Sequence, residues 1–343
     1  MRRDFLPMAI RERGVTARAI APSTFTASSI PSLTTGQYPA THGVWMFDDT
    51  LAERPPLFGA DHDVGFDAET VWTDLPSAAK PPLQINRVTE ESRLADLSPP
   101  FTHFVHDIGP HAPYGFTNED FESTREFFSE YEHRRPQLVD LYQEDCHNSA
   151  RRFLDLYDQL DRRGLLDSTL VVFTSDHGPS REIRNHLDGS REPYCGGSTG
   201  EYRGHKFSLF EGGIRVPGIV SYPAELDGGR ECGELAVSMD VFPTVCEVCG
   251  VETPPEIDGA NLWPTLTGDE PTPHDRVYWA FGEQRAVRDG DWKLVAGGTV
   301  IDGDPDDVHL SNLDADPGEV TNRATGRPEV AEELEAAARS WRE

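Results

Sequence analysis

An aspartate and a histidine stand side by side directly after a short apolar run. Residues 169–174 are Thr-Leu-Val-Val-Phe-Thr, which is typical of a strand buried on both faces, and Ser175, Asp176, His177 and Gly178 follow at once. Polar side chains at the C-terminal end of such a strand lie where open α/β sheets bind ligands. A carboxylate beside an imidazole can hold a divalent cation, although the same pair can also form a turn with a capping aspartate.

Other residues that could take part in chemistry are spread along the chain. Thr26 lies in a stretch of small residues that leads into a predicted helix, and His111 follows a predicted strand. The adjacent pair His205 and Lys206 comes after a polar, glycine-rich segment. A fold must bring these distant positions together before they can form one site.

Strands and helices predicted from the sequence separate these positions. Residues 101–107 have the composition of a strand that ends in a turn at 109–114, and residues 137–163 have the apolar periodicity of a helix. A second strand is predicted at 213–220 and a helix at 240–250, whereas 48–100 and 181–204 are predicted to be mainly loop. Short strand-like pieces at 276–280 and 286–295 and a helix at 328–342 indicate a small C-terminal α+β subdomain. We therefore expect two parts, residues 1–270 and 271–343.

Short motifs follow one another in order along the chain. They are residues 26–30 with 35–43, 110–114 (Pro-His-Ala-Pro-Tyr), 175–178 (Ser-Asp-His-Gly), 204–217 (Gly-His-Lys-Phe-Ser-Leu-Phe-Glu-Gly-Gly-Ile-Arg-Val-Pro), 240–244, 258–259, and 313–319 with Asn322. In this order they resemble the sulfatase family of the alkaline phosphatase superfamily, from the first residues to about 325. The run at 204–217 is the most specific of them.

The resemblance implies a fold and a type of reaction. The fold is a three-layer, alkaline-phosphatase-like α/β domain with a mixed, mainly parallel central sheet. The reaction is metal-dependent hydrolysis of a sulfuric or phosphoric ester through a covalent intermediate, with a small anionic ester as substrate. A divalent cation would activate the nucleophile and neutralise charge on the anionic group. Mn²⁺, Zn²⁺, Mg²⁺ and Ca²⁺ all remain open.

The resemblance also assigns roles to residues. By position Thr26 is the nucleophile, and Asp176 and His177 are metal ligands, with His205 as a further ligand or an anion contact. Lys206 and His111 would hold the non-reacting oxygens or protonate the leaving oxygen. Loop or supporting roles are the alternative for His205 and for His42, and structural roles are favoured for His103, His106 and His147. Glu211 and Arg215 are expected to pair with each other or to cap a strand.

Three features depart from the family pattern. Position 26 is threonine, so oxidation to the formylglycine that sulfatases form from Cys or Ser is chemically impossible here. The arginine of the same motif is Ile30, and residues 44–105 contain no Gly-Lys-Trp-His-Leu-Gly element. A plain threonine alkoxide is the kind of nucleophile that phosphoesterases of the superfamily use. These departures favour phosphate esters over sulfate esters.

The beginning of the chain differs from the family as well. Relatives begin with an apolar strand that ends in a metal-binding aspartate, followed by Arg-x-Asp. Here Arg2-Arg3-Asp4 matches the second element, and the strand would lie upstream of Met1. We expect a true start further upstream. The alternative is a protein that has lost a strand and a ligand, which would leave the edges of neighbouring strands unpaired.

The composition excludes several classes of partner. The 343 residues include 31 basic and 60 acidic ones, a net charge of −29, and the only lysines are Lys80, Lys206 and Lys293. Such a surface repels phosphate backbones and anionic lipids, so we expect neither a nucleic-acid nor a membrane partner. Few lysines with dispersed acids indicate a halophilic protein in a salt-rich cytoplasm. The sequence says nothing about the oligomeric state.

Cysteines and apolar segments agree with a cytoplasmic location. The five cysteines are an odd number in a long chain, which argues against a disulfide framework. Cys246 and Cys249 fit the packing of a helix better than a redox or zinc site. No run of about 18 apolar residues is present, and the N-terminus lacks the core of a signal peptide.

Three functions are compatible with the sequence. The first is a metal-dependent hydrolase of sulfuric or phosphoric esters that acts through Thr26. The second is a non-catalytic binding protein that retains the sulfatase fold. The third is a transferase that passes a phosphoryl-linked headgroup to an alcohol, because an alcohol can replace water in resolving a covalent intermediate.

Overall fold

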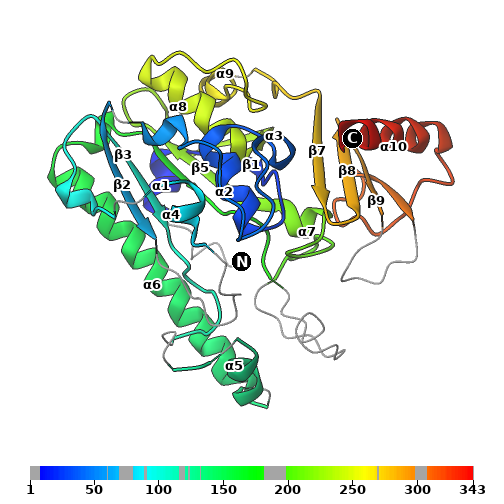
Figure 1. The fold of residues 1–343 in the computed structure, drawn as a ribbon, viewed down its shortest axis with the longest axis horizontal. Helices are drawn as coiled ribbons and strands as arrows, with labels where there is room; N and C mark the ends of the chain where they lie inside the picture. Colours follow the sequence, from blue (N-terminus) through cyan, green and yellow to red (C-terminus); the bar gives the residue numbers. More distant parts are fainter. Residues whose placement is uncertain are drawn as a thin grey trace.

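The computed structural model describes residues 8–59, 61–68, 80–88, 91–115, 120–122, 124–131, 133–180, 198–268, 270–297 and 307–342 (Figure 1). Arg2, Arg3, Asp4 and most of the loop predicted at 181–204 lie outside these residues. Within them, the N-terminal part of the chain builds a layered α/β body, and the last strands and helix stand to one side of it (Figure 1).

The central sheet has four strands in the order β4-β5-β1-β6. Their bounds are Val171–Thr174, Arg215–Ser221, Val15–Ile20 and Arg230–Val237. Strand β5 is antiparallel to both β4 and β1, whereas β1 is parallel to β6. Hence β1, β4 and β6 run in one direction and β5 opposes them, which confirms a mixed central sheet, although two of its three strand pairs are antiparallel. A separate parallel pair is formed by β2 (Asp63–Ala68) and β3 (Phe101–His106).

Helices cover both faces of the central sheet. Neighbouring residues of a strand point to opposite faces, so Ile219 and Val220 of β5 serve two different cores. Ile219 packs with Tyr157 and Leu160 of the long helix α6 (Arg135–Arg162). Val220 packs with a cluster on the other face that includes Leu262 and Leu266, beside or within helix α9 (Trp263–Thr267). The three-layer architecture follows from this alternation.

The C-terminal part forms its own antiparallel sheet. Strands β10 (Val308–Asn312), β9 (Trp292–Ala296), β8 (Gln284–Asp289) and β7 (Arg276–Phe281) are neighbours in that order. Helix α10 (Pro328–Arg342) covers one face through Leu334 and Ala338. The other face packs on the central sheet.

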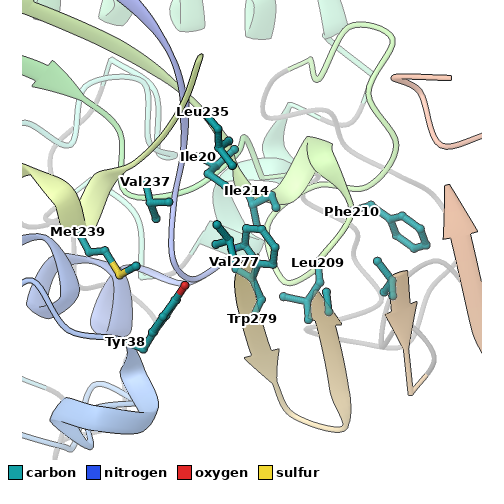
Figure 2. Packing of buried hydrophobic residues seen from close by; sticks show 12 residues of the cluster. Ile20, Tyr38, Leu209, Phe210, Ile214, Leu235, Val237, Met239, Val277 and Trp279 are labelled. Carbon is teal, nitrogen blue, oxygen red and sulfur yellow. The ribbon is translucent and has the colours of Figure 1, made fainter. Parts of the chain in front are cut away.

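One apolar cluster joins the two sheets. Ile20 and Val237 come from the central sheet, and Val277 and Trp279 come from β7, and all are buried (Figure 2). The indole nitrogen of Trp279 donates a hydrogen bond of 2.8 Å to the carbonyl oxygen of Ala21. The C-terminal sheet is thus attached through a continuous core.

Most predicted elements are present, with two differences. The strand predicted at 213–220 begins two residues later, because residues 211–214 form the single turn α7 (Glu211–Ile214). Strand β2 lies in a region predicted to be mainly loop. The remaining elements are α1 (Met8–Arg13), α2 (Thr26–Thr35), α3 (Pro39–His42), η2 (Pro56–Phe58), α4 (Pro82–Ile85), η3 (Leu94–Asp96), α5 (Thr124–Glu130), η4 (Leu166–Ser168), η6 (Ser238–Asp240) and α8 (Val241–Cys249).

Two further features concern the described cysteines and helices. The four described cysteines are free thiols, and Cys246 is buried on α8 while Cys249 is exposed. Among the described residues, no helix combines the length and the apolar character that crossing a membrane requires.

Candidate active site

Thr26 is the first residue of helix α2, at the edge of the central sheet where β1 ends. The chain leaves β1 at Ile20, and every residue from 21 to 30 is buried except Thr26, which is half-buried. Its hydroxyl is therefore the side-chain group of this segment that solvent or a ligand can reach. The N-terminal end of a helix carries partial positive charge, which favours an alkoxide or a bound anion there.

Helix α2 is polar and yet buried, which requires internal hydrogen bonds. Ser28 is within 2.7 Å of the Ser23 hydroxyl, and Ser29 donates to the Ser23 carbonyl oxygen. Thr34 donates to the side chain of Asn86 at 2.7 Å. These bonds let a helix rich in serine and threonine sit in the core, and they hold the residues behind Thr26 in place.

The structure brings Asp176 and His177 to Thr26. The hydroxyl oxygen Oγ1 of Thr26 lies 3.1 Å from Nε2 of His177, which in turn lies 3.2 Å from Oδ2 of Asp176. The imidazole is fixed at its other nitrogen, because Nδ1 donates to the carbonyl oxygen of Gly178 at 2.8 Å. In the neutral ring, Nε2 is then the unprotonated nitrogen and faces the Thr26 hydroxyl.

The electrostatics of this pair are set by burial and by nearby positive charge. Burial is the main cause that lowers the pKa of His177 to about 4, and the charge of Lys206 acts in the same direction, while Asp176 opposes it. For Asp176, burial favours the neutral acid. The charges of His177 and His106, the Thr26 hydroxyl and Lys206 outweigh it and hold the pKa well below its ordinary value. A neutral imidazole thus stands beside an ionised carboxylate at neutral pH.

Lys206 enters the site from the segment that precedes α7. Its ammonium lies 5.6 Å from the ring centre of Phe25 and 5.4 Å from that of Phe207. Its charge acts on both Asp176 and His177. Lys206 is therefore close enough to Asp176 and His177 for its charge to affect both.

Two histidines of the β3 region also approach the site. His111 is exposed, its Nδ1 is 2.7 Å from the carbonyl oxygen of Ala112, and its charge acts on His177. His106, at the end of β3, faces the charge of Asp176, and burial lowers its pKa. The Nδ1 atom of His106 is buried and has no hydrogen-bond partner among the described residues. The sequence favoured a structural role for His106, but its position at the end of a strand was a usable signal.

His205 does not join Asp176 and His177. Its ring is only 3% exposed, and Nδ1 lies 2.9 Å from the carbonyl oxygen of Lys206. Across the described part of the chain, no three His, Cys, Asp or Glu side chains converge as metal ligands. The expected set of Asp176, His177 and His205 is thus not found as one ligand group among the described residues, and the role of His205 stays a prediction.

The donor atoms at Thr26 nevertheless suit a divalent cation in kind. A carboxylate oxygen, a neutral imidazole nitrogen and a hydroxyl oxygen meet at one point, and these are ligand types that Zn²⁺ and Mn²⁺ accept. Asp176 and His177 would supply two of the three protein ligands that catalytic zinc sites commonly have. A cation held there would lower the pKa of the Thr26 hydroxyl and offset charge on an anionic group.

The other predicted candidates have structural roles. Glu211 pairs with Arg215 at 3.0 Å, as expected from the sequence, and is itself fully buried. On its other side, Nζ of Lys293 lies 3.0 Å from Glu211 and 3.2 Å from Glu319. His42 contacts Ser32 at 2.9 Å behind α2.

The sequence matches two known protein families. Residues 85–251 match the family described as Sulfatase, and residues 200–340 match the family described as N-sulphoglucosamine sulphohydrolase, C-terminal. The chain is 39% identical over 305 residues to the low-salt glycan biosynthesis sulfotransferase Agl7 of Haloferax volcanii, covering 85% of this chain and 71% of that protein. The chain belongs to the sulfatase family.

Other members of the sulfatase family match over shorter stretches. The steryl-sulfatase of Mus musculus is 48% identical over 112 residues, which is 32% of this chain and 17% of that enzyme. This match covers about a third of the chain. Within the alkaline phosphatase superfamily, this sulfatase-family chain carries threonine at position 26, where the motif order predicts the nucleophile.

Solved structures agree on the fold. One similar structure is a complex with the substrate D-glucosamine-2-N,6-O-disulfate, with a TM-score of 0.66 and 16% identity over 97% of this chain and 91% of that one. Another is the phosphonate monoester hydrolase of Agrobacterium radiobacter, with a TM-score of 0.59 and 17% identity over 98% of this chain and 90% of that one. At this identity the likeness concerns the fold alone.

Proposed function

We propose that this sulfatase-family chain is a metal-dependent hydrolase of phosphoric or sulfuric esters in which Thr26 is the nucleophile. The observation that carries the proposal is the contact between Oγ1 of Thr26 and Nε2 of His177 at the N-terminal end of α2. A half-buried hydroxyl beside an ionised carboxylate, with the charge of Lys206 acting on that carboxylate, supports the proposal. Hydrolysis of small anionic esters needs these groups.

The proposed reaction has two steps. In the first, the Thr26 hydroxyl gives up its proton to water, Oγ1 forms a bond to the phosphorus or sulfur atom, and the bond from that atom to the alcohol oxygen breaks. The leaving oxygen takes a proton, for which the exposed His111 is the proposed donor, while Lys206 holds the non-reacting oxygens. In the second step water attacks the same atom, which releases inorganic phosphate or sulfate and restores the Thr26 hydroxyl.

Phosphate esters are the proposed preference. A threonine hydroxyl lacks the oxidation chemistry that makes formylglycine, so the intermediate must be a plain ester of Thr26. Phosphorus accepts such an exchange readily with metal assistance. Mn²⁺ and Zn²⁺ are the proposed cations, held in part by Asp176 and His177.

The test compares matched aryl phosphate, phosphodiester and sulfate substrates in molar KCl with Mn²⁺ or Zn²⁺. We expect Thr26→Ala to lower turnover on the order of 10³-fold or more, and Thr26→Ser to retain part of it. Thr41→Val is the matched control, because Thr41 is exposed and lies outside the site. Mass spectrometry of the quenched reaction should find the transferred group on Thr26. Turnover by Thr26→Ala at the wild-type rate would refute the role of Thr26.

Transfer to an alcohol is the second candidate. The relative of 39% identity is named a sulfotransferase, so the acceptor need not be water. Adding a sugar alcohol to the assay should divert the group from water if the chain is a transferase. A folded protein that binds Mn²⁺ but cleaves none of the three substrates would instead favour transfer to a specific acceptor or a binding role.

A further inference from the structure

The segment that carries Lys206 is held at its backbone from three directions. The amide of Lys206 donates to the carbonyl oxygen of Pro179 at 3.0 Å, just beyond Asp176 and His177. The amide of Phe207 donates at 2.8 Å to the hydroxyl of Thr24, two residues before Thr26. The carbonyl oxygen of Phe207 accepts a hydrogen bond of 2.9 Å from Nε2 of Gln284.

Phe207 adopts a backbone conformation that needs such support. Its φ angle is 73°, in the left-handed region that residues with a Cβ atom seldom occupy. A strained residue persists where the surroundings fix it, and such residues gather at functional sites. Here the strained residue directly follows Lys206.

Gln284 comes from the C-terminal sheet, as the first residue of β8. It is 0% exposed, and both ends of its amide are used. Nε2 donates to Phe207, and Oε1 accepts from the amide of Leu209 at 3.4 Å. A buried amide that bridges two backbone groups of one loop fixes the course of that loop.

A shift of Phe207 would be transmitted to the ammonium of Lys206. That ammonium lies 5.4 Å from the ring centre of Phe207 and 5.6 Å from that of Phe25, and the two ring centres are 5.5 Å apart, so both rings contact it from the same side. Rings within about 6 Å attract a cation. If Phe207 turns out of its left-handed conformation, one of the two rings leaves and the ammonium loses its place.

The C-terminal sheet holds the far end of the same segment as well. Lys293 of β9 bonds to Glu211, and the backbone amide of Glu211 donates to Glu319 at 2.6 Å. The segment from Lys206 to Glu211 is thus fixed at both ends by residues beyond position 270.

We propose that Gln284 is a positioning residue for Lys206, so that the C-terminal sheet takes part in the reaction by fixing the cation that binds the ester's anionic group. The expected effect of Gln284 on ester turnover rests on the proposed function. The expected effect of Gln284 on the position of Lys206 does not. Gln284 touches no substrate. It acts through Phe207.

The first test is a double-mutant cycle on ester turnover. Gln284→Met keeps the length of the side chain and removes both hydrogen bonds, and we expect kcat/KM to fall on the order of 10²-fold, as for a misplaced catalytic group. In a Lys206→Met background, Gln284→Met should lower kcat/KM hardly any further, because the ammonium that Gln284 positions is already absent. An equal loss in both backgrounds would overturn the proposal.

A matched control separates positioning from general damage to the sheet. Asn322 is likewise an amide that bridges two backbone groups of the C-terminal part, donating to Val308 at 2.9 Å and accepting from Leu310 at 3.1 Å. Asn322→Leu should leave kcat/KM within about twofold at the same residual stability. If Gln284→Met fails to fold, Gln284→Glu replaces it, because it keeps the acceptor for Leu209 and loses the donor to Phe207.

The second test does not require activity. The chain has three lysines, and Lys293 is 0% exposed, so acetylation followed by peptide mass spectrometry compares Lys206 directly with Lys80. We expect the rate at Lys206 relative to Lys80 to change several-fold in Gln284→Met and to stay constant in Asn322→Leu. An unchanged ratio in folded Gln284→Met would overturn the proposal. If the wild type turns over no ester, the proposed function fails while this ratio still decides the role of Gln284.

Discussion

At the scale of single residues, the protonation states of Asp176 and His177 decide what the site can bind. Burial keeps the imidazole neutral, with a pKa of about 4, and the surrounding positive charge keeps the carboxylate ionised. A metal ion binds only deprotonated ligands, so both groups are already in the required state at neutral pH. The site needs no proton release from these two residues to accept a cation.

A buried histidine away from the site gives a prediction about pH. Nε2 of His274 lies 2.9 Å from Oδ2 of Asp240, and the two side chains are 7% and 0% exposed. Burial alone would lower the pKa of His274, but the hydrogen bond and the charge of Asp240 raise it above the ordinary 6.5. The folded protein therefore holds this proton more tightly than the unfolded chain. The stabilisation of the folded protein by protonated His274 is complete below pH 6.5 and is lost as the pH rises through the pKa of His274 in the folded state.

We expect His274→Asn to lower the free energy of unfolding by about 1.5–3 kcal/mol at pH 6, as for a hydrogen bond to a charged group. The difference from wild type should shrink as the pH increases toward 9. Urea titrations at several pH values in constant KCl measure it. His133→Asn is the control, because His133 is exposed and should show no such trend. A difference that grows with pH would contradict the raised pKa.

The residues of the site were partly predictable from the sequence. The structure brings together four of the predicted residues, Thr26, Asp176, His177 and Lys206. Each of them follows or precedes a strand, and these strand ends lie at the same edge of the central sheet. His205 could not be placed in advance, since adjacent residues in a loop point in different directions and only the backbone decides which enters the site. Gln284 carries no signal, because nothing in a strand sequence says that its first side chain will reach another loop.

At the scale of elements, the contact between the Asp176–His177 turn and α7 is unusually close. The amide of Gly178 donates to the carbonyl oxygen of Gly213 at 2.9 Å. A Cβ atom added at Gly178 would lie 2.0 Å from the carbonyl oxygen of Gly212. No side chain fits at position 178, because the clash would be with a backbone carbonyl group, which cannot rotate away as a side chain can. The glycine at 178 is therefore required for α7 to pack against the turn.

Gly178→Ala should accordingly damage both stability and activity. We expect a loss of about 1–3 kcal/mol in the free energy of unfolding, as for overpacked cores, together with a large fall in ester turnover. Gly233→Ala in β6 is the matched control, because a Cβ atom there meets nothing within 4 Å, and it should stay within about 0.5 kcal/mol. Denaturant unfolding in molar KCl gives both values. Equal stability of the two variants would show that α7 can move aside.

Strand β2 and turn α7 were not predicted from the sequence, because contacts with the rest of the fold determine both. Strand β2 contains Gly65 and two aspartates, so its composition does not resemble a strand, and its pairing with β3 supplies the order instead. The turn α7 replaced the start of a predicted strand because Gly212 and Gly213 pack tightly against neighbouring backbone. Long periodic elements such as α6 and α10 were predictable, since their apolar faces repeat over many residues.

At the scale of the whole molecule, the net charge of −29 works against folding. The acidic residues are dispersed along the chain and outnumber the basic ones, 60 to 31. Each carboxylate therefore repels other carboxylates that lie within about one Debye length. That length is about 10 Å at 0.1 M salt and about 3 Å at 1 M. Screening should therefore remove most of the self-repulsion between these two concentrations.

We expect the thermal midpoint to rise steeply as KCl increases from about 0.1 M to about 1 M and to level off beyond it, because screening saturates once the Debye length is shorter than the spacing of the charges. Exclusion of salt from the surface would raise the midpoint steadily instead, without levelling. Scanning calorimetry over a KCl series distinguishes the two. Sucrose, which stabilises without screening, is the control and should raise the midpoint only gradually. A midpoint that is constant below about 1 M KCl would mean that repulsion among the acidic residues is not what limits the stability of this fold.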